Sequence, residues 1–180
     1  MRKVTLYIEC SSTYIGKKLR LSGYVLEYIT HGLPVTGQDF REGSGTYNQE
    51  YLLTIAEALG HMKEPCELLI CGSNRFVLNM IRDRLQIWAE HDFTSNGRPV
   101  MNQEEWKAVW EKIKQHKVSV QIGKHSYSSW LLTEMEGKRN EKPKKASETG
   151  NKDPEDTEGS GHNRDHANGS DLQEAERISG

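Results

Sequence analysis

The strongest constraint on the fold is a short strand-like run, residues 67–71, in which four apolar residues follow Glu67 and lead through Gly72, Ser73 and Asn74 into a helix-like stretch. Leucine, isoleucine and cysteine follow one another in this run without a polar break, which is typical of a strand that is covered on both faces. Ser73 is predicted to cap the helix that follows. The predicted buried stripe of this helix is Phe76, Val77, Met80 and Ile81. The sequence therefore predicts an α/β protein with this strand inside a sheet.

Three further strands are predicted before this one. Residues 3–10 alternate between apolar and polar side chains, which indicates a strand with one more deeply buried face. Residues 23–30 are predicted to form a second strand, and turn residues at 31–34 lead into a third near 35–42. Because the connections are short, we expect these three strands to run antiparallel.

Two helices are predicted from capping-box pairs. Thr46 and Gln49 form the first pair, and the helix that follows is predicted to end near Gly60. Asn102 and Glu105 form the second pair. The apolar stripe of that second helix comprises Trp106, Val109, Trp110 and Ile113.

The remaining elements complete the order β-β-β-α-β-α-α-β-α. They are a short helical piece at 85–91, a fifth strand at 117–123 and a last helix at 128–136. This order predicts a five-stranded mixed sheet flanked by helices.

The C-terminal segment, residues 137–180, differs from the rest in composition. Hydrophobic residues make up 34% of the whole chain, and this segment contributes only Ala146, Ala167, Leu172, Ala175 and Ile178. Such a segment cannot bury enough apolar surface to offset its conformational entropy, so we expect a disordered charged tail. The predicted folded domain is residues 1–136. A protein partner could be bound through the tail.

Charge and cysteine content exclude several classes of protein. The tail holds 8 Lys+Arg and 10 Asp+Glu of the chain's 24 and 26, which leaves 16 of each in the folded domain. A neutral domain is not a strong polyanion binder by charge alone. Cys10, Cys66 and Cys71 form no CxxC pair, which disfavours structural zinc. With no signal peptide and no apolar run of membrane length, we expect a cytoplasmic protein without a membrane partner.

Four stretches carry a resemblance to a known family. They are VTLYIECSS, TYNQEYLLTIAEAL, LLICGSNRFVLNMI and NGRPVMNQEEWKAVWEKIKQHKVSVQIGKHS. In order and spacing they resemble the type 1 ribonuclease H family, and the likeness covers residues 2 to about 136. The resemblance implies the ribonuclease H-like fold, and it implies hydrolysis of the RNA strand of an RNA–DNA hybrid.

The family's chemistry uses four carboxylates that hold two divalent metal ions about 4 Å apart. The resemblance places Glu9 and Glu50 at two of these positions. Gly72 falls where the third carboxylate belongs, and no acid stands near Ser129, where the fourth belongs. Glu134 and Glu136 lie one to two turns further along the helix. The resemblance also places His125 at the family's mobile histidine, which assists the departure of protons or product.

Glu9 and Glu50 alone supply too little negative charge for two metal ions. Because Mg²⁺ commonly keeps its waters and uses one or two carboxylates plus a phosphate, a weak single site for Mg²⁺ or Mn²⁺ is one expectation, and no metal site is the other. Glu50 is equally explained as an acid in the first turn of a helix. Glu9 is equally explained as a solvated strand end, and His125 as a solvated loop side chain.

Candidate substrate contacts are few. The resemblance makes Asn48 the remaining residue for reading the RNA 2′-hydroxyl, with Tyr47 beside it. Lys17, Lys18 and Arg20 form a local cationic patch that could bind a nucleic-acid backbone, although ordinary surface lysine is the alternative. Two tryptophans, Trp88 and Trp130, are candidates for base stacking, whereas Trp106 and Trp110 are predicted to lie in the core.

Three functions are consistent with these residues. The first is a nucleic-acid-binding domain, for hybrid or single strand, with lost or strongly reduced hydrolysis. The second is a slow, metal-dependent ribonuclease H that uses Glu9, Glu50 and His125. The third is a protein-interaction module on the same fold, because a fold does not fix a function.

Overall fold

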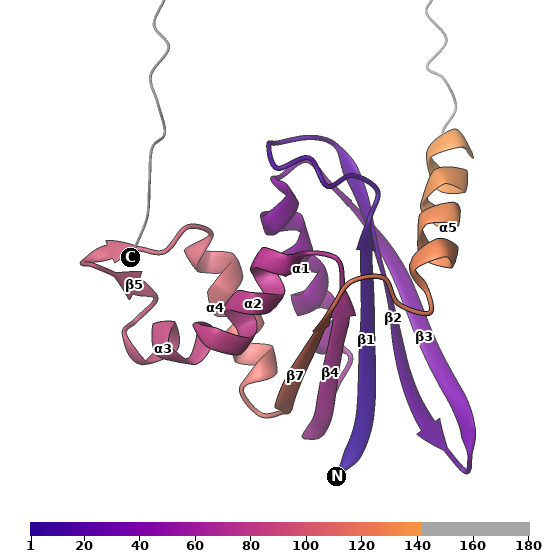
Figure 1. Ribbon diagram of the computed structural model, residues 1–180, viewed down its shortest axis with the longest axis horizontal. Coiled ribbons are helices and arrows are strands. Elements are labelled where there is room, and N and C mark those ends of the chain that lie inside the picture. Colours follow the sequence, from indigo (N-terminus) through magenta and orange to yellow (C-terminus); the bar gives the residue numbers. More distant parts are fainter. Residues whose placement is uncertain (142–180) are drawn as a thin grey trace, which may run out of the picture. The chain divides into compact units, whose positions relative to one another are not determined.

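Strand β1 lies at the centre of a five-stranded mixed sheet. In the computed structural model, which describes residues 1–141, the strands follow the order β3-β2-β1-β4-β7 (Figure 1). Their bounds are β1 Arg2–Cys10, β2 Arg20–Thr30, β3 Leu33–Gly43, β4 Cys66–Gly72 and β7 Lys117–Ile122. β1 pairs antiparallel with β2 and parallel with β4, while β2–β3 is antiparallel and β4–β7 is parallel. The predicted α/β fold with a five-stranded mixed sheet is confirmed.

Helices cover both faces of this sheet. Figure 1 shows α1 to α4 on one side and α5 on the other. Their bounds are α1 Tyr47–Gly60, α2 Arg75–Asp83, α3 Leu85–Glu90, α4 Gln103–Ile113 and α5 Ser128–Glu141. Because side chains alternate along a strand, Leu6 and Ile8 of β1 face α1 in the larger core, whereas Tyr7 packs beside Leu131 of α5. Glu9 therefore lies on the α5 face.

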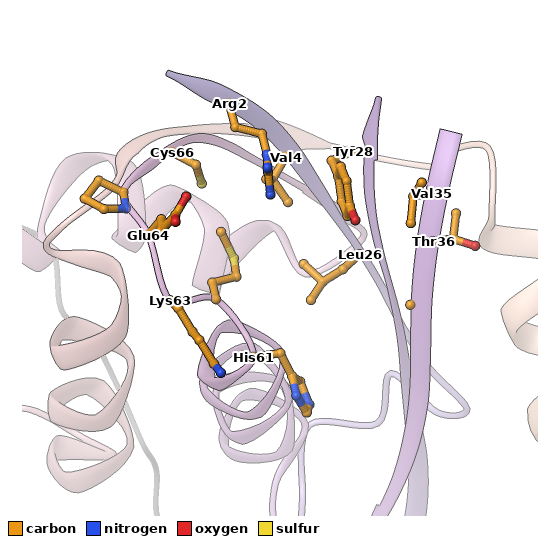
Figure 2. Close-up of a pocket in the computed structure, with 13 residues that line it drawn as sticks. Arg2, Val4, Leu26, Tyr28, Val35, Thr36, His61, Lys63, Glu64 and Cys66 are labelled. Atoms are coloured by element: carbon orange, nitrogen blue, oxygen red, sulfur yellow. The ribbon is translucent and has the colours of Figure 1, made fainter. Parts of the chain in front are cut away.

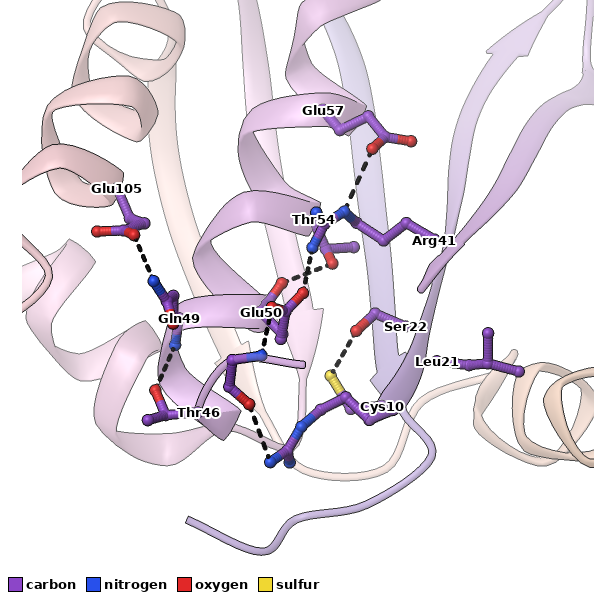
Figure 3. Close-up of polar contacts among 12 residues, drawn as sticks. Cys10, Leu21, Ser22, Arg41, Thr46, Gln49, Glu50, Thr54, Glu57 and Glu105 are labelled. Carbon is purple, nitrogen blue, oxygen red and sulfur yellow. Dashed lines mark hydrogen bonds and ion pairs between the residues drawn. The ribbon is translucent and has the colours of Figure 1, made fainter. Parts of the chain in front are cut away.

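The two predicted capping boxes are replaced by a contact between helices. Thr46 accepts a hydrogen bond from the backbone N–H of Gln49, as predicted. The amide of Gln49, however, donates to the carboxylate of Glu105 at 2.7 Å (Figure 3). Asn102 has a positive φ of 59° and makes no side-chain cap. The predicted Asn102–Glu105 box is therefore wrong, since the side chain of Glu105 links α4 to α1.

The start of α2 also differs from its prediction by one residue. Asn74, not Ser73, caps the helix, and its Oδ1 accepts from the N–H of Val77 at 3.0 Å. Phe76 is 51% exposed, and the buried residues are Val77, Leu78 and Ile81. The shift leaves the hydroxyl of Ser73 free to bind elsewhere.

Several smaller features complete the domain. A hairpin, β5 (Thr94–Ser95) and β6 (Arg98–Pro99), forms between α3 and α4, because Asn96 and Gly97 both adopt the positive φ that a tight turn requires. Helix α5 runs to Glu141 and so takes in residues 137–141 of the predicted tail, while residues 142–180 lie outside the described part of the chain. Within residues 1–141 no helix is long and apolar enough to cross a membrane.

The tryptophans divide between core and surface. Trp106 is buried as predicted, and Trp88 packs edge-on against it with ring centroids 5.2 Å apart. Trp110 is partly buried against the same core. Trp130 is 38% exposed and lies beside Phe40. Among these four, Trp130 alone offers a substantially exposed ring.

A hollow of about 490 Å³ lies at the amino end of β1 (Figure 2). Its floor is apolar and includes Val4 and Leu26, and Tyr28 forms one wall. The side chain of Arg2 reaches into it and stacks over the Tyr28 ring at 5.0 Å. The loop after α1, residues 61–65, and Cys66 at the start of β4 close the other side.

Candidate functional site

Glu9 is a buried acid near the end of β1, with a residue exposure of 7%. The hydroxyl of Ser128, at the start of α5, donates to its Oε1 at 2.6 Å. The hydroxyl of Ser73, just after β4, lies 3.2 Å from Oε1 and 3.4 Å from Oε2. A carboxylate taken out of water needs such donors. The alternative that Glu9 is a solvated strand end is therefore wrong.

His125 is packed against Glu9, and only 2% of its side chain is exposed. The backbone N–H of Tyr127 points at its Nδ1 at 3.2 Å, so Nδ1 acts as the acceptor and the hydrogen of a neutral ring sits on Nε2. Nε2 lies 3.1 Å from the carbonyl oxygen of Ile8 and 3.3 Å from Oε1 of Glu9. A neutral imidazole satisfies all these contacts. The alternative of a solvated loop histidine is wrong, because the ring also packs against Tyr7.

Glu50 lies in the first turn of α1 and is 4% exposed. Nη1 of Arg41, on β3, lies 2.5 Å from its Oε2, and the N–H of Gly45 donates to its Oε1 at 2.9 Å (Figure 3). A Cβ at Gly43 would lie 2.0 Å from Oε2 of Glu50. The carboxylate therefore lies directly against the backbone of β3, in space that only glycine at position 43 leaves open.

Glu9 and Glu50 occupy one region but have separate partners. Both carboxylates are close enough to Cys10 to raise the pKa of its thiol, although burial is the main reason that this pKa rises to about 12. Glu9 is bound by Ser73, Ser128 and His125, whereas Glu50 is bound by Arg41 and Gly45. The two sets of donors have no residue in common.

The space beside Gly72 is filled by Tyr51. A Cβ at Gly72 would lie 1.7 Å from the hydroxyl oxygen of Tyr51, so no side chain fits there unless that ring moves. Tyr51 is fully buried, and its hydroxyl has no hydrogen-bond partner among the residues that the structure describes. Burial raises the pKa of Tyr51 well above its ordinary value, so the phenol is neutral.

In this arrangement the side chains do not fit a divalent metal ion. The oxygens of Glu9 face hydroxyl and imidazole donors, and those of Glu50 face a guanidinium and an amide. Mg²⁺ and Mn²⁺ require oxygen ligands with open lone pairs. Across residues 1–141 no three His, Cys, Asp or Glu side chains lie close enough to hold an ion together. The predicted Glu9–Glu50 metal pair stays a prediction, and it requires both acids to exchange their partners.

The predicted substrate residues lie at the rim of this region. Lys17 and Lys18 are exposed, on a loop whose Lys18 N–H approaches the carbonyl oxygen of Gly45 at 3.4 Å. Arg20 is 2% exposed, and its guanidinium donates to the carbonyl oxygens of Ser12, Tyr14 and Gly16. The predicted cationic patch is therefore corrected to the two lysines, since Arg20 holds their loop from within.

Asn48 is half-buried, and its Oδ1 accepts from the side-chain amide of Asn74 at 2.9 Å. Because Asn74 also caps α2, this bond ties the start of α1 to the start of α2. The side-chain oxygen of Asn48 is therefore already hydrogen-bonded within the protein. Its role in substrate recognition stays a prediction.

Sequence reasoning missed four residues of this region: Arg41, Tyr51, Ser73 and Ser128. Ser73 was assigned to a helix cap, and the fourth family position was placed near Ser129, one residue away from the hydroxyl that reaches Glu9. The sequence could have pointed to Arg41 and Tyr51 only through two glycines. Gly43 and Gly72 each mark a place where another side chain comes close to the backbone.

Comparison with solved structures defines the class of fold. LC9-RNase H1, a type 1 RNase H with the type 2 active-site motif, superposes with a TM-score of 0.60 over 76% of this chain and 70% of that chain, at 16% identity. The N-terminal RNase H domain of rv2228c from Mycobacterium tuberculosis superposes with a TM-score of 0.56 over 78% of this chain and 98% of that chain, at 10% identity. These likenesses show a ribonuclease H-like fold.

Sequence comparison gives the family. The family model described as RNase H matches residues 1–127, and the chain therefore belongs to the RNase H family. It is similar to the ribonuclease H of Clostridium botulinum, at 30% identity over 131 residues, 70% of this chain and 86% of that protein. The ribonuclease HI of Haemophilus influenzae is 32% identical over 100 residues, 55% of this chain. That match spans 63% of the Haemophilus protein, less than two thirds of its length.

Proposed function

We propose that this chain is an RNase H-family domain that binds nucleic acid, with RNA–DNA hybrids as its first ligand, and that its hydrolysis of hybrids is lost or strongly reduced. The observation that carries this proposal is the hydroxyl of Tyr51 beside Gly72. It fills the space from which the family's third carboxylate would project. A ligand position that is occupied by a neutral phenol contributes no charge to a metal centre.

The charges of the remaining residues support the same conclusion. Two divalent ions placed close together repel each other, and acidic ligands normally offset that repulsion. Glu9 and Glu50 supply two negative charges, and Arg41 offsets one of them within the protein. Ser128, near the fourth family position, is a hydrogen-bond donor to Glu9. Arg41 therefore balances the charge of Glu50, and neutral hydroxyl donors solvate that of Glu9.

Binding is supported by the surface beside these acids. Lys17 and Lys18 project from the loop that contacts Gly45, the residue whose N–H binds Glu50. A foamy viral protease–reverse transcriptase of the same fold class was solved in complex with an RNA/DNA hybrid (TM-score 0.53, 12% identity, 74% of this chain, 19% of that one). A duplex backbone that crosses the two lysines would pass beside Glu50.

A slow, metal-dependent ribonuclease H is the second candidate, and the family comparisons favour it. The curated relatives described above are named as ribonuclease H, and they match this chain at 30% and 32% identity. The resemblance places Glu9, Glu50 and His125 at family positions. For this candidate, Mg²⁺ or Mn²⁺ bound with the substrate phosphate would displace the donors now on Glu9 and Glu50, and His125 would assist proton transfer.

One assay separates the two candidates. The full chain is incubated with a labelled RNA–DNA hybrid in Mg²⁺ and in Mn²⁺, beside a Glu50→Gln variant. We expect no product above the variant in either metal. Cleavage that Glu50→Gln abolishes would overturn the first candidate and establish the second.

Binding is measured in parallel by fluorescence anisotropy over a range of salt concentrations. We expect the double variant K17A/K18A to weaken hybrid binding and to reduce the slope of log K against log salt by about 2, since each phosphate contact contributes about 0.9. K112A/K114A, which removes two exposed lysines around the end of α4, is the matched control and should leave the slope unchanged. If the anisotropy does not change at low salt, the chain does not bind the hybrid, and the protein-interaction module is the remaining candidate.

A further inference from the structure

Arg41 reaches from β3 to two carboxylates of α1 (Figure 3). Its Nη1 contacts Oε2 of Glu50, and its Nε lies 3.4 Å from Oε2 of Glu57. The side chain of Glu50 is 6% exposed and that of Glu57 is 40% exposed. The guanidinium therefore meets one acid inside the protein and the other at its surface.

We infer that Arg41 is a positioning residue that gives Glu50 its positive partner in place of a divalent metal ion. The inference rests on the proposed function, because it identifies what keeps this part of the site in a metal-free arrangement. The misfit between the side chains and a metal ion then has a specific source. It is an arginine that contacts one carboxylate oxygen of Glu50, an acid that the resemblance places at a family metal position.

The geometry of Glu50 supports this role on both of its oxygens. Oε2 accepts from Arg41, and Oε1 accepts from the N–H of Gly45. Added side-chain atoms at Gly43 or Gly45 would come within 2.6 Å of these oxygens, so glycine at both positions lets the carboxylate approach the backbone there. Glu50 is thus held from three directions, by Arg41, by Gly45 and by the helix that carries it.

The chemistry of arginine keeps one side of this ion pair positively charged at any physiological pH. A guanidinium is always charged and offers several N–H donors in a fixed plane, which suits two acids at once. A divalent ion that approached Oε2 of Glu50 would meet this charge and be repelled by it. Metal binding at Glu50 and the Arg41–Glu50 ion pair therefore exclude each other.

The test compares metal dependence of unfolding in the full chain and in Arg41→Gln. Thermal unfolding is followed by circular dichroism in EDTA and in MnCl₂ at constant ionic strength, and Mn²⁺ affinity is measured by calorimetry. We expect the melting temperature of the unaltered chain to be the same in both solutions. R41Q should melt lower in EDTA, recover in part with Mn²⁺, and bind Mn²⁺ at least about tenfold more tightly than the unaltered chain.

Two control variants locate the effect. R82Q removes an exposed arginine whose ion pair with Asp83 is at the surface, and it should behave as the unaltered chain does. R41Q/E50Q should lose the Mn²⁺ response that R41Q gains. The inference is overturned if the unaltered chain already binds Mn²⁺ through Glu50 as tightly as R41Q does, or if R41Q shows no Mn²⁺-dependent recovery.

A double-mutant cycle separates the coupling of Arg41 with Glu50 from a general loss of stability in R41Q. R41Q/E50Q replaces the ion pair by two neutral amides, so it should fold and should be more stable to urea than R41Q. Strictly additive losses would contradict a positioning role for Arg41. None of these readouts involves hybrid cleavage. The inference and the proposed function can therefore be refuted independently of each other.

Discussion

The two ends of β1 differ in how their charges are balanced. At the carboxyl end, Glu9 and Glu50 are buried and every carboxylate oxygen has a donor from the protein. At the amino end, Arg2 and Lys63 line an open hollow of about 490 Å³ and form no ion pair within residues 1–141 (Figure 2). The end that carries Glu9 and Glu50 is thus filled from within, whereas the opposite end is open. Substitutions should therefore cost more stability at the carboxyl end.

The largest effect is expected from Gly72→Ala. Its Cβ would lie 1.7 Å from the Tyr51 hydroxyl and 3.2 Å from the carbonyl oxygen of Ile8. Overpacking of this kind costs up to about 3 kcal/mol of unfolding free energy, measurable by urea denaturation. In G72A/Y51F the clashing oxygen is absent, so most of the loss should be recovered.

The control for this prediction is Gly37→Ala, on β3, where an added Cβ meets no atom within 4 Å. It should change stability little. If G72A were as stable as G37A, the position of Tyr51 beside Gly72 would be incorrect.

A smaller loss is expected from Ser128→Ala. This change removes the 2.6 Å hydrogen bond to buried Glu9 and should cost about 1–3 kcal/mol of unfolding free energy. Ser129→Ala, at the exposed neighbouring position, is the matched control and should fall within about 0.5 kcal/mol of the unaltered chain. Equal losses in the two variants would show that Ser128 does not reach Glu9.

The stability of the protein at alkaline pH should depend on Cys10, whose buried thiol lies near Glu9 and Glu50. Burial raises the pKa of its thiol from 9.0 to about 12, so the folded state keeps a proton that the unfolded state loses. Stability from this group is complete below pH 9 and is lost as pH rises toward 12, by up to about 1.4 kcal/mol per pH unit. Urea unfolding of Cys10→Ala over this range should show a shallower decline, and parallel declines would refute the assignment.

The smallest effect is expected at the open end. Arg2→Ala removes a cation–π contact with Tyr28 at 5.0 Å and should cost about 0.5–1 kcal/mol in urea unfolding. Lys3→Ala, at the neighbouring exposed position, is its control. A loss as large as that of Ser128→Ala would mean that the amino end is not the looser one.

The fold could be predicted because periodicity is a local property. Alternation over residues 3–10 and the apolar run at 67–71 each report the faces of one strand, and their order fixed the mixed sheet. The partners of the polar side chains could not be predicted in the same way. Thr46 caps its helix through a bond within one turn. The side chains of Gln49 and Ser73 instead bind Glu105 and Glu9, which are distant in the sequence. Local propensity favours a helix-capping role for each of these polar side chains. It contains no information about a carboxylate that is distant in the sequence and close in space.

The candidate site was predicted only in part for a related reason. The resemblance to the family singles out Glu9, Glu50 and His125, and Glu9 and His125 do meet. Arg41 and Tyr51 depend on space left by Gly43 and Gly72, which is a property of three dimensions. The distinction between Ser128 and Ser129 depends on where α5 begins, and helix ends are the least certain boundary in a sequence.

The buried guanidinium of Arg20 has a consequence for the loop that carries Lys17 and Lys18. By fastening the carbonyl oxygens of Ser12, Tyr14 and Gly16 to one rigid fork, it removes much of that loop's freedom before any ligand arrives. A polyanion that docks on the two ammonium groups would then lose less entropy in ordering the loop backbone that carries them. Folding has already restricted the loop backbone, so binding does not have to.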